Sequence, residues 1–327
     1  MDRELLHRSA RFVVTVMVPV GIALTIGTRS WLVYAVLSAI TAFLGDEGGR
    51  PLRRLGHMLI GPCTLLGGAA VGSIGWPNSG FIALSVLLGL FYGLVEGGHP
   101  LLLLAARFAG YGLVLGFEVA ALRTAEIVAA LATALAAWLI SLAWEAGRRT
   151  RRQVGVEPVL GSLWRALGSW RRRWSFALAA GLSIGAANLV GLWVGLGHAY
   201  WATLTILIVL RDDMAESAEA VTHRVSGTLL GVAVVAALIT WLPGPQALFA
   251  AMVVIAALRW PALSLDLTLG TACITAFVLL VADLLAASPV AEMRVLQDRM
   301  LAIMVGCCFA LAGLRLRRGI ADLAKAG

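Results

Sequence analysis

The residue of this chain that most clearly points to a binding function is an arginine inside an apolar stretch. Arg107 lies in the apolar run 101–115 and has no partner nearby in the sequence. A lone cation in a bilayer costs at least about 2.5–3.5 kcal/mol on insertion scales, so it should face the bundle interior, paired or in water. A planar guanidinium suits the carboxylate of an organic acid. Three explanations stay open: substrate binding, a structural pair with Glu118 on the same helix face, and snorkelling toward the cytoplasm.

Two carboxylates lie near the outer ends of equivalent apolar segments. Glu118 and Asp283 are one position out of register with each other. Intramembrane carboxylates are the usual proton carriers, because a dry setting raises their pKa. We expect one of them to carry a proton during transport, or both to lie at the membrane interface. His99 precedes Pro100 near the inner end of the same segment as Glu118, so we expect it at a helix start, at the cytoplasmic mouth.

The chain repeats its polar landmarks at one constant offset, the offset from Tyr34 to Tyr200. Tyr34, Ile40, Leu44, Asp46, His57, Gly61, Pro77 and Glu126 recur as Tyr200, Ile206, Leu210, Asp212, His223, Gly227, Pro243 and Glu292. A long fixed period predicts a duplicated structural unit. In membrane proteins such repeats are typical of transporters, with the site where the halves meet. Arg107 breaks the repeat, because its counterpart is Cys273.

Composition predicts an all-α integral membrane fold. Hydrophobic residues make up 60% of the chain and charged residues 13%, with a mean hydropathy of +0.89. Soluble domains carry about 25% charged residues. We expect about twelve transmembrane helices, near 12–28, 30–45, 56–75, 80–96, 99–121, 125–144, 175–196, 199–212, 225–242, 247–260, 262–286 and 295–314. Segments 30–45 and 199–212 fall short of the roughly 20 residues that a span needs, so they extend into loops, re-enter or cross a thinned region.

The distribution of basic residues predicts the orientation. If the N-terminus is cytoplasmic, Arg29, Arg123, Arg294 and Arg299 fall in the outer loops, Arg107 lies within a segment, and the other Lys and Arg residues face the cytoplasm. The positive-inside rule then places both termini in the cytoplasm, and we expect a multi-pass protein of the bacterial inner membrane. The net charge of +8 is explained by this topology, so we expect no nucleic-acid partner.

The domain organisation follows from the repeat. We expect a first six-helix repeat at 1–146, a basic cytoplasmic linker at 147–173 and a second six-helix repeat at 174–327, with no soluble domain. Leu160, Leu163, Trp164, Leu167, Trp170 and Trp174 recur at helical spacing beside basic residues. A basic helix with a Trp/Leu face is typical of the membrane interface. This helix is expected to anchor the two halves, or to have a regulatory or lipid-sensing role.

Residues 200–231 carry the most specific pattern. It reads Tyr-Trp-Ala-Thr-Leu-Thr from Tyr200, Val-Leu-Arg-Asp up to Asp212 and His-Arg-Val-Ser-Gly-Thr-Leu-Leu-Gly from His223. This pattern resembles the signature of the fusaric-acid-resistance (FUSC) family, grouped with the aromatic acid exporters. A weaker match in the same register covers 34–65. Distant relatives include the plant aluminium-activated malate transporters, anion channels built as dimers of six-helix subunits, which implies a covalent pseudo-dimer here.

The resemblance also marks candidate residues. Tyr200, Trp201 and Thr205 are candidates for the translocation path, where an aromatic substrate would stack, although the aromatic pair also suits the interface belt. The predicted cytoplasmic gate and motif set is His99, Asp46, Asp212, His223, Arg224 and Gly227. For Asp46 and Asp212 we favour structural pairing with Arg50, Arg53, Arg54 and Arg224 over gating. Gly227 and Gly231 are four apart, a spacing that lets membrane helices approach closely.

The sequence as a whole predicts an efflux transporter of organic acids. Aromatic carboxylic acids as substrates are implied by the resemblance alone, and proton coupling is the expected energy source. A passive organic-anion channel and a non-transporting membrane scaffold are the alternatives. The sequence lacks a phosphate-binding Gly-x-x-x-x-Gly-Lys-Ser/Thr segment, a nucleophile–base pair and a metal-ligand cluster, so we expect no enzyme, metal or cofactor. Many family members carry a soluble domain after their helices, which a partner subunit would have to supply here; self-association stays open.

Overall fold

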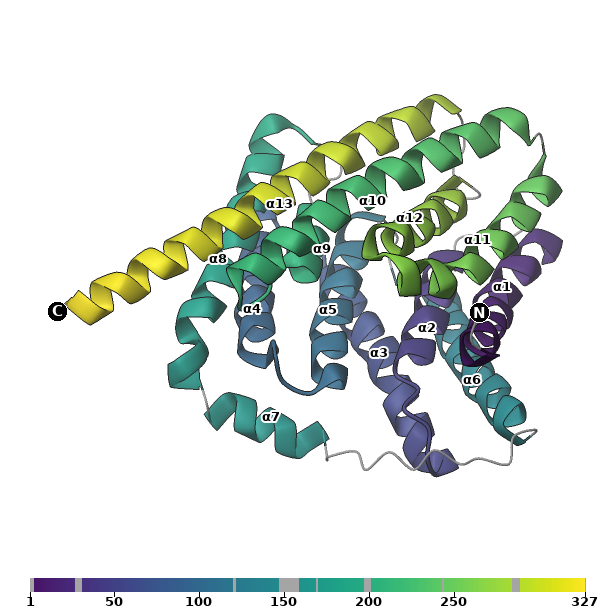
Figure 1. Cartoon of the computed structure of the whole chain (residues 1–327), viewed down its shortest axis with the longest axis horizontal. Helices are drawn as coiled ribbons and strands as arrows, with labels where there is room; N and C mark the ends of the chain where they lie inside the picture. The colour runs from purple at the N-terminus through teal and green to yellow at the C-terminus, as the bar shows by residue number, and fades with distance from the viewer. Residues whose placement is uncertain are drawn as a thin grey trace. The chain divides into compact units, whose positions relative to one another are not determined.

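The computed structural model describes residues 3–26, 31–119, 122–146, 159–168, 170–196, 201–242, 244–283 and 289–326. All regular structure in these ranges is helical. The elements are α1 (Arg3–Ile26), α2 (Leu32–Leu44), α3 (Pro51–Gly72), α4 (Asn78–Val95), α5 (Pro100–Val114), a π-helical turn (Leu115–Val119), α6 (Thr124–Ala146), α7 (Val159–Gly168), α8 (Trp170–Val194), α9 (Trp201–Val209), α10 (Met214–Trp241), α11 (Pro245–Leu265), α12 (Leu267–Asp283) and α13 (Pro289–Ala326) (Figure 1).

Helix boundaries follow from local chemistry. Proline is the first residue of α3, α5, α11 and α13, where its missing N–H has no helical partner to lose. Gly97 and Gly195 follow the ends of α4 and α8 with φ of 69° and 74°, a left-handed conformation that glycine adopts without a Cβ clash. The apolar segments therefore begin and end where turn residues permit.

The expectation of an all-α membrane protein is confirmed. Each of the twelve predicted segments overlaps a helix, and among the described residues nine helices are long and apolar enough to cross a membrane. Helices α2 and α9 contain 13 and 9 residues, or about 20 and 14 Å at 1.5 Å per residue. The hydrocarbon core is about 30 Å thick, so neither helix crosses it alone. A count of twelve spans stays a prediction.

The chain forms two compact units, and each unit takes helices from both halves of the sequence. Unit 1 comprises Met1–Pro62, Arg123–Gln153 and Thr222–Leu296; unit 2 comprises Cys63–Leu122, Val154–Val221 and Gln297–Gly327. In unit 1, α1 packs on α11, α11 on α12 and α1 on α2; in unit 2, α8 packs on α4, α4 on α5 and α8 on α9. In the sequence repeat, α1, α2, α11 and α12 correspond to α8, α9, α4 and α5. The three helix pairs of unit 1 therefore correspond to the three pairs of unit 2. The predicted boundaries at 146 and 174 stay a prediction.

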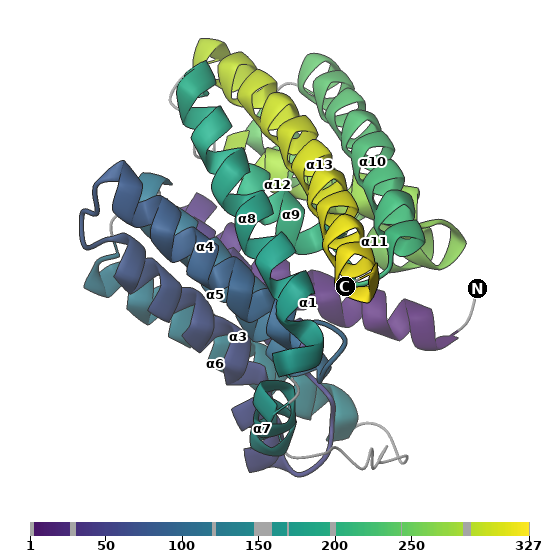
Figure 2. The ribbon, with the colours of Figure 1, turned by 90° about the vertical axis from the view of Figure 1, so that its left-hand side faces the viewer.

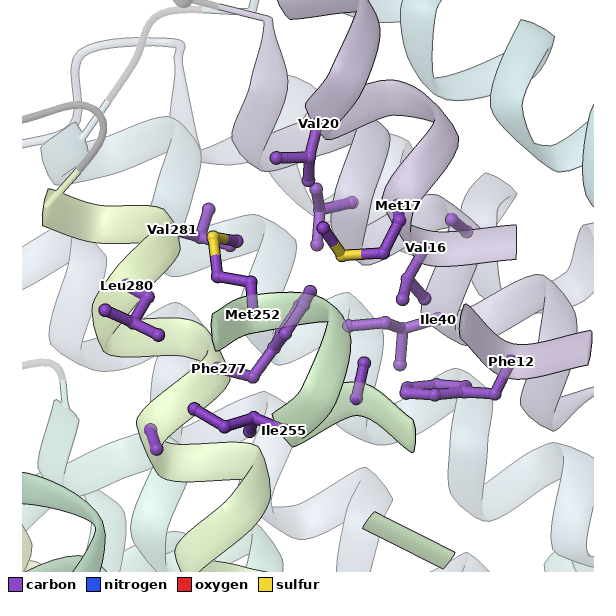
Figure 3. Close-up of a cluster of buried hydrophobic side chains, with 14 of the residues drawn as sticks. Phe12, Val16, Met17, Val20, Ile40, Met252, Ile255, Phe277, Leu280 and Val281 are labelled. Carbon is purple, nitrogen blue, oxygen red and sulfur yellow. The ribbon is translucent and has the colours of Figure 1, made fainter. Parts of the chain in front are cut away.

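The core of unit 1 gathers around one face of α1. Phe12, Val16 and Val20 are four residues apart, so they line a single stripe of that helix. Figure 3 shows these side chains meeting Met252 of α11 and Phe277 of α12. In a bilayer, where lipid tails are as apolar as the side chains, such interlocking contacts are a main source of helix association.

Small residues bring the helices of unit 2 together. A Cβ added at Gly93 of α4 would lie 2.5 Å from the Cα of Ala177 on α8, and one at Gly112 of α5 would lie 1.9 Å from the carbonyl oxygen of Leu65 on α3. Only glycine permits such backbone approach. Figure 2 shows α8 beside α13, where the hydroxyl of Ser183 lies against Gly313 and leaves no space for a Cβ.

The predicted linker contains a helix, α7, which packs on α4 and α5 within unit 2. Trp164 of α7 is 71% exposed, and Trp170 and Trp174 at the start of α8 are also exposed. Residues 147–158 of the linker lie outside the described ranges. The exposed tryptophans agree with a position at a membrane surface, where amphipathic rings accumulate.

Candidate functional site

The candidate site lies in unit 2, at the carboxyl end of the short helix α9. Arg107 of α5 donates from Nε to the carbonyl oxygen of Leu207 at 2.9 Å. Tyr92 of α4 is fully buried and donates its hydroxyl to the carbonyl of Leu210 at 2.7 Å. The last carbonyls of a helix lack intrahelical donors and carry partial negative charge. Arg107 and Tyr92 therefore supply hydrogen-bond donors to the unpaired main-chain carbonyls at this helix end.

Arg107 keeps part of its hydrogen-bonding capacity free. Its Nη2 is buried and makes no hydrogen bond to the described residues. The Cζ atom lies 5.9 Å from the Tyr92 ring, which stabilises the cation without accepting the in-plane N–H groups. A guanidinium has five N–H donors, so an anion with acceptor oxygens could complete the shell that Leu207 begins.

A pocket of about 390 Å³ opens beside this helix end. Its lining consists of Glu96, Gly97, Arg173, Asp212, Asp213 and Glu216. The turn after α4 supplies the first two and α8 supplies Arg173. The turn after α9 supplies Asp212 and Asp213, and the first turn of α10 supplies Glu216. Four carboxylates thus face a single arginine in the lining. Among the described residues, no group of His, Cys, Asp and Glu is placed to hold a metal ion.

Glu96 is the titrating group of the pocket with a perturbed pKa. Burial raises the pKa of the Glu96 carboxyl, and the nearby carboxylate of Asp212 adds to the rise. Arg211, Arg107 and Arg173 oppose it, but the net pKa is raised. Arg173 also donates to the main-chain carbonyl of Glu96, which holds the turn in place. A carboxyl group that protonates more readily than usual and interacts electrostatically with Arg107 is suited to proton exchange.

Asp212 joins the turn after α9 to α13. Arg317 forms an ion pair with its carboxylate and donates to its main-chain carbonyl at 2.6 Å. The Asp212 side chain is nevertheless 61% exposed. Asp213 caps α10 by accepting from the main-chain N–H of Ala215 at 2.7 Å. The preference for structural pairing at Asp212 agrees with this geometry, although Arg317 was not among the predicted partners.

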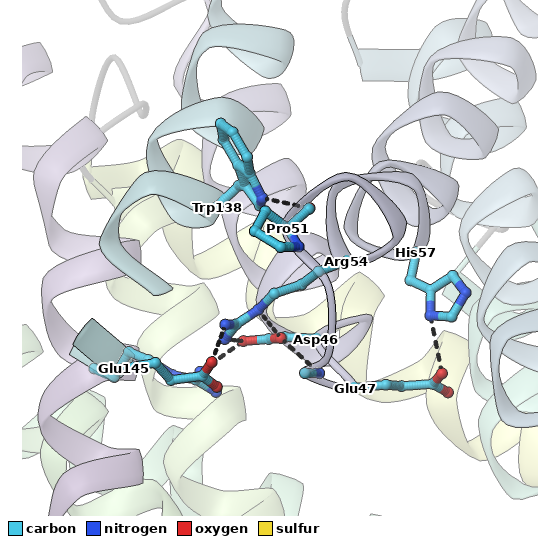
Figure 4. A network of polar contacts seen from close by, with 9 residues as sticks. Asp46, Glu47, Pro51, Arg54, His57, Trp138 and Glu145 are labelled. Carbon is cyan, nitrogen blue, oxygen red and sulfur yellow. Dashed lines mark hydrogen bonds and ion pairs between the residues drawn. The ribbon is translucent and has the colours of Figure 1, made fainter. Parts of the chain in front are cut away.

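Asp46 occupies the corresponding turn of unit 1 and is enclosed. Arg54 of α3 binds both carboxylate oxygens at 2.6 Å, and Arg11 of α1 adds a third contact at 2.6 Å. Arg54 also pairs with Glu145 of α6 at 2.6 Å (Figure 4). The side chains of Asp46 and Arg54 are 1% and 0% exposed. Pairing with Arg54 was predicted from the sequence, whereas Arg11 was missed because it is distant from Asp46 along the chain.

The charges around Asp46 outweigh its burial. Burial alone raises the pKa of the Asp46 carboxyl, but the hydrogen bonds from Arg54 and the charges of Arg11 and Arg54 leave the net pKa below its ordinary value. In the same turn, Nδ1 of His57 lies 3.0 Å from the carboxylate of Glu47, an ion pair when the imidazole is protonated. This network ties α1, α2, α3 and α6 together at one end of unit 1.

The remaining predicted residues have local partners. His99 caps α5, its Nδ1 accepting from the main-chain N–H of Leu101 at 3.1 Å. Thr205 donates to the carbonyl of Trp201 at 2.9 Å, within its own helix. Trp201 packs beside the cluster of Phe81, Leu113, Val114 and Leu204. The structure thus places His99, Trp201 and Thr205 in unit 2, the unit of Arg107; their predicted roles in transport stay predictions.

The predicted motif residues of α10 contact α12 in unit 1. Nδ1 of His223 lies 2.7 Å from the hydroxyl of Thr268. A Cβ on Gly227 would lie 2.6 Å from that of Thr271, which is the close approach expected of this spacing. Arg224 accepts a hydrogen bond at its main-chain carbonyl from Thr228 at 2.7 Å. Tyr200 lies outside the described residues, and the side chains of Glu118 and Asp283 are likewise not described.

Sequence reasoning missed three residues of the candidate site. Tyr92 and Glu96 come from α4 and the turn after it, directly before α5, and Arg173 comes from α8, far from Arg107 in the sequence. Only the Glu96-Gly97-Gly98 run before His99 offered a signal, because a carboxylate followed by turn residues marks an accessible helix end.

Comparison with known protein families identifies the second half of the chain. Residues 184–313 match the model of a family described as fusaric acid resistance protein-like. This segment is therefore similar to the fusaric acid resistance protein-like family. The match runs from α8 into α13 and includes the pattern at 200–231, so the resemblance seen in the sequence is confirmed. Comparisons with curated proteins and with solved structures gave no match.

The similarity of this segment to the fusaric acid resistance protein-like family agrees with the architecture. The family indicates a role in membrane transport or efflux rather than catalysis, and the apolar helices make the chain a multi-pass membrane protein. The matched segment contains Asp212, Asp213 and the carbonyls of Leu207 and Leu210, which form one side of the candidate site. The similarity to malate transporters stays a prediction.

Proposed function

We propose that this protein exports organic acids across the bacterial inner membrane, with aromatic carboxylic acids as its substrates and protons as the coupling ion. Arg107 binds the substrate carboxylate, and Glu96 makes that binding depend on pH. Both termini lie in the cytoplasm, as the distribution of basic residues predicts. The two sequence halves act as a duplicated transport unit.

The free Nη2 of Arg107 is the observation that carries this proposal. A buried guanidinium nitrogen without an acceptor is costly, so it calls for a partner such as a bound anion. The carbonyl of Leu207 fixes the guanidinium through Nε, so little side-chain entropy remains to be lost when an anion binds. A carboxylate can therefore bind to an arginine that is already oriented.

Glu96 supplies the coupling to protons. When Glu96 is ionised, its negative charge partly neutralises that of Arg107 and weakens the attraction for the substrate carboxylate. When it is protonated, that competition disappears and the site carries one more positive charge. The affinity for a carboxylate should therefore fall as pH rises through the raised pKa of Glu96.

Transport by the purified full chain in liposomes tests the proposal. The probe is radiolabelled 4-hydroxybenzoate, measured with and without an imposed pH gradient. Arg107→Gln removes the cation, and Arg165→Gln, in the exposed face of α7, is the matched control within the same unit. We expect Arg107→Gln to lose at least about 90% of the flux and Arg165→Gln to retain it.

The other outcomes separate the alternatives. Full flux in Arg107→Gln would overturn the assignment of Arg107. Flux that follows only the gradient of the anion, without a response to pH, would identify a passive channel. The absence of flux in the wild type, for hydroxybenzoate and for other organic anions, would favour a scaffold. Reporter fusions at each end would test the cytoplasmic location of both termini.

A further inference from the structure

A second buried guanidinium lies in unit 1, in a position that the sequence repeat makes comparable with Arg107. Cys273 of α12 is the repeat counterpart of Arg107, so the second half lacks an arginine on this helix. Arg259 of the neighbouring helix α11 lies close enough to Cys273 for the two side chains to interact electrostatically. Each unit therefore has a cation at this helix, from α5 itself in unit 2 and from the adjacent helix in unit 1.

Arg259 has fewer acceptors than Arg107. Its Nε and Nη1 are both buried and make no hydrogen bond to the described residues. The charge of Arg8 acts on Arg259, and no carboxylate among the described residues forms an ion pair with it. Two carboxylates of the unit that are buried have other partners: Asp46 binds Arg54 and Arg11, and Glu126 accepts from the main-chain N–H of Arg123. The charge of Arg259 is thus without a protein counter-ion in the described part of the chain.

Aromatic rings surround Arg259 without neutralising it. Its Cζ lies 4.7 Å from the Trp260 ring and 5.5 Å from the Phe12 ring. Arg8 approaches the same Trp260 ring at 3.7 Å. Aromatic faces attract cations but leave the N–H groups in the guanidinium plane without acceptors. Two like charges share one aromatic residue, an arrangement that an anion would stabilise.

We propose that Arg259 and Arg8 form a second anion-binding site that takes the carboxylate of an organic acid. This inference rests on the proposed function, because it assigns to unit 1 the same substrate class as Arg107 in unit 2. The carboxylate accepts from Arg259 and is further attracted by Arg8. Trp260 and Phe12 are buried in the core of unit 1, where their rings hold the guanidinium of Arg259 in place.

Counting bound ligands tests this site. The probe is radiolabelled benzoate, measured by equilibrium dialysis against the purified full chain for wild type, Arg259→Gln, Arg107→Gln, the double variant and the control Arg165→Gln. We expect two benzoates per chain for the wild type and the control, one for each single variant and none for the double variant. The affinity of the lost site should fall roughly tenfold or more.

Further variants separate binding from folding. Arg8→Gln should weaken the same site as Arg259→Gln, and Arg259→Lys should retain part of the affinity because it retains the charge. Each variant is checked by its elution as a single detergent-solubilised species. Arg259→Gln removes a buried charge that has no counter-ion among the described residues, so it should fold at least as well as the wild type.

Two results would overturn the inference while leaving the proposed function intact. One is a single benzoate per wild-type chain that disappears in Arg107→Gln and persists in Arg259→Gln. The other is a site at Arg259 that phosphatidylglycerol or inorganic phosphate occupies and benzoate does not, which would identify a phosphate site. The absence of benzoate binding in the wild type, together with no transport, would instead refute both.

Discussion

Asp46 and Asp212 occupy equivalent positions of the sequence repeat, each just after a short helix, yet their surroundings differ. Asp46 is enclosed by Arg11 and Arg54, with its side chain 1% exposed. Asp212 pairs with Arg317, is 61% exposed and lines an open pocket. The same residue type after the same kind of helix is therefore buried in unit 1 and accessible to solvent in unit 2. The neighbouring helices, more than the motif itself, decide which role an aspartate can have.

The difference arises from substitutions at equivalent positions. Arg11 and Arg54 of unit 1 have Ala177 and Ala220 as their counterparts in the second half of the repeat. Without these arginines, the turn after α9 cannot be sealed as the turn after α2 is. The pocket of unit 2 is thus a consequence of two missing side chains, and the comparison predicts different costs for the same mutation.

The largest effect is expected for Asp46→Asn. Removing this charge leaves Arg54 and Arg11 without their shared carboxylate in a buried network, and breaking such a pair costs about 3–5 kcal/mol. Thermal unfolding of the detergent-solubilised protein should show a markedly lower midpoint. Asp212→Asn is the matched control and should cost at most about 1 kcal/mol, because its pair is largely exposed. Equal costs at the two positions would remove the distinction between a closed and an open unit.

The helix contact between α3 and α5 gives a second, smaller effect. A Cβ at Gly112 would lie 1.9 Å from the carbonyl oxygen of Leu65, whereas one at Gly67 would meet nothing within 4 Å. Gly112→Ala should therefore separate the helices and cost about 1–3 kcal/mol. Gly67→Ala should be neutral or stabilising by up to about 1 kcal/mol, through helix propensity. If both variants unfold at the same temperature, close backbone packing does not stabilise unit 2.

Much of the fold could be predicted from this sequence, but less of the site. Hydropathy located the apolar helices because a bilayer imposes length and composition directly. Pairing of Asp46 with Arg54 was predicted because the two residues are close in the sequence. The site around Arg107 was incomplete, because Tyr92 and Arg173 reach it through helix packing that no local pattern encodes. The composition of each unit from helices of both halves was likewise not predicted. The repeat shows which helices correspond to one another, but not which helices pack together.

A polar helix contact that only one unit has gives a third, still smaller effect. Thr203 donates to Asn188 at 3.0 Å in the buried contact of α8 with α9. The counterparts in unit 1 are Leu37 and Ile22, an apolar pair. Thr203→Val should cost about 0.5–1.5 kcal/mol because it leaves the amide of Asn188 unpaired. The double variant Asn188→Ile with Thr203→Leu reproduces the unit 1 pair, so its thermal midpoint should recover toward the wild type. Additive losses in the double variant would contradict this.

The smallest effect concerns pH, where the two units should respond with opposite sign. The pKa of Asp46 is lowered, so its contribution to stability is present above about pH 3.9, the ordinary value, and is lost as pH falls through the folded pKa. The pKa of Glu96 is raised, so its contribution is present below about pH 4.3 and is lost as pH rises through the folded pKa. Acid should weaken the closed turn of unit 1 and strengthen the open pocket of unit 2.

The variant Glu96→Gln isolates the second of these responses. Thermal midpoints of wild type and Glu96→Gln are measured from pH 4 to pH 8, and their difference cancels the titration of the other pocket carboxylates. The thermal midpoint of the glutamine variant should rise relative to that of the wild type as pH rises. The variant has no carboxylate to bury near Asp212, a cost that Arg107, Arg173 and Arg211 only partly offset in the wild type. A difference that does not change with pH would mean that Glu96 titrates as an ordinary surface carboxyl, and the open pocket would then lose its proton-responsive group.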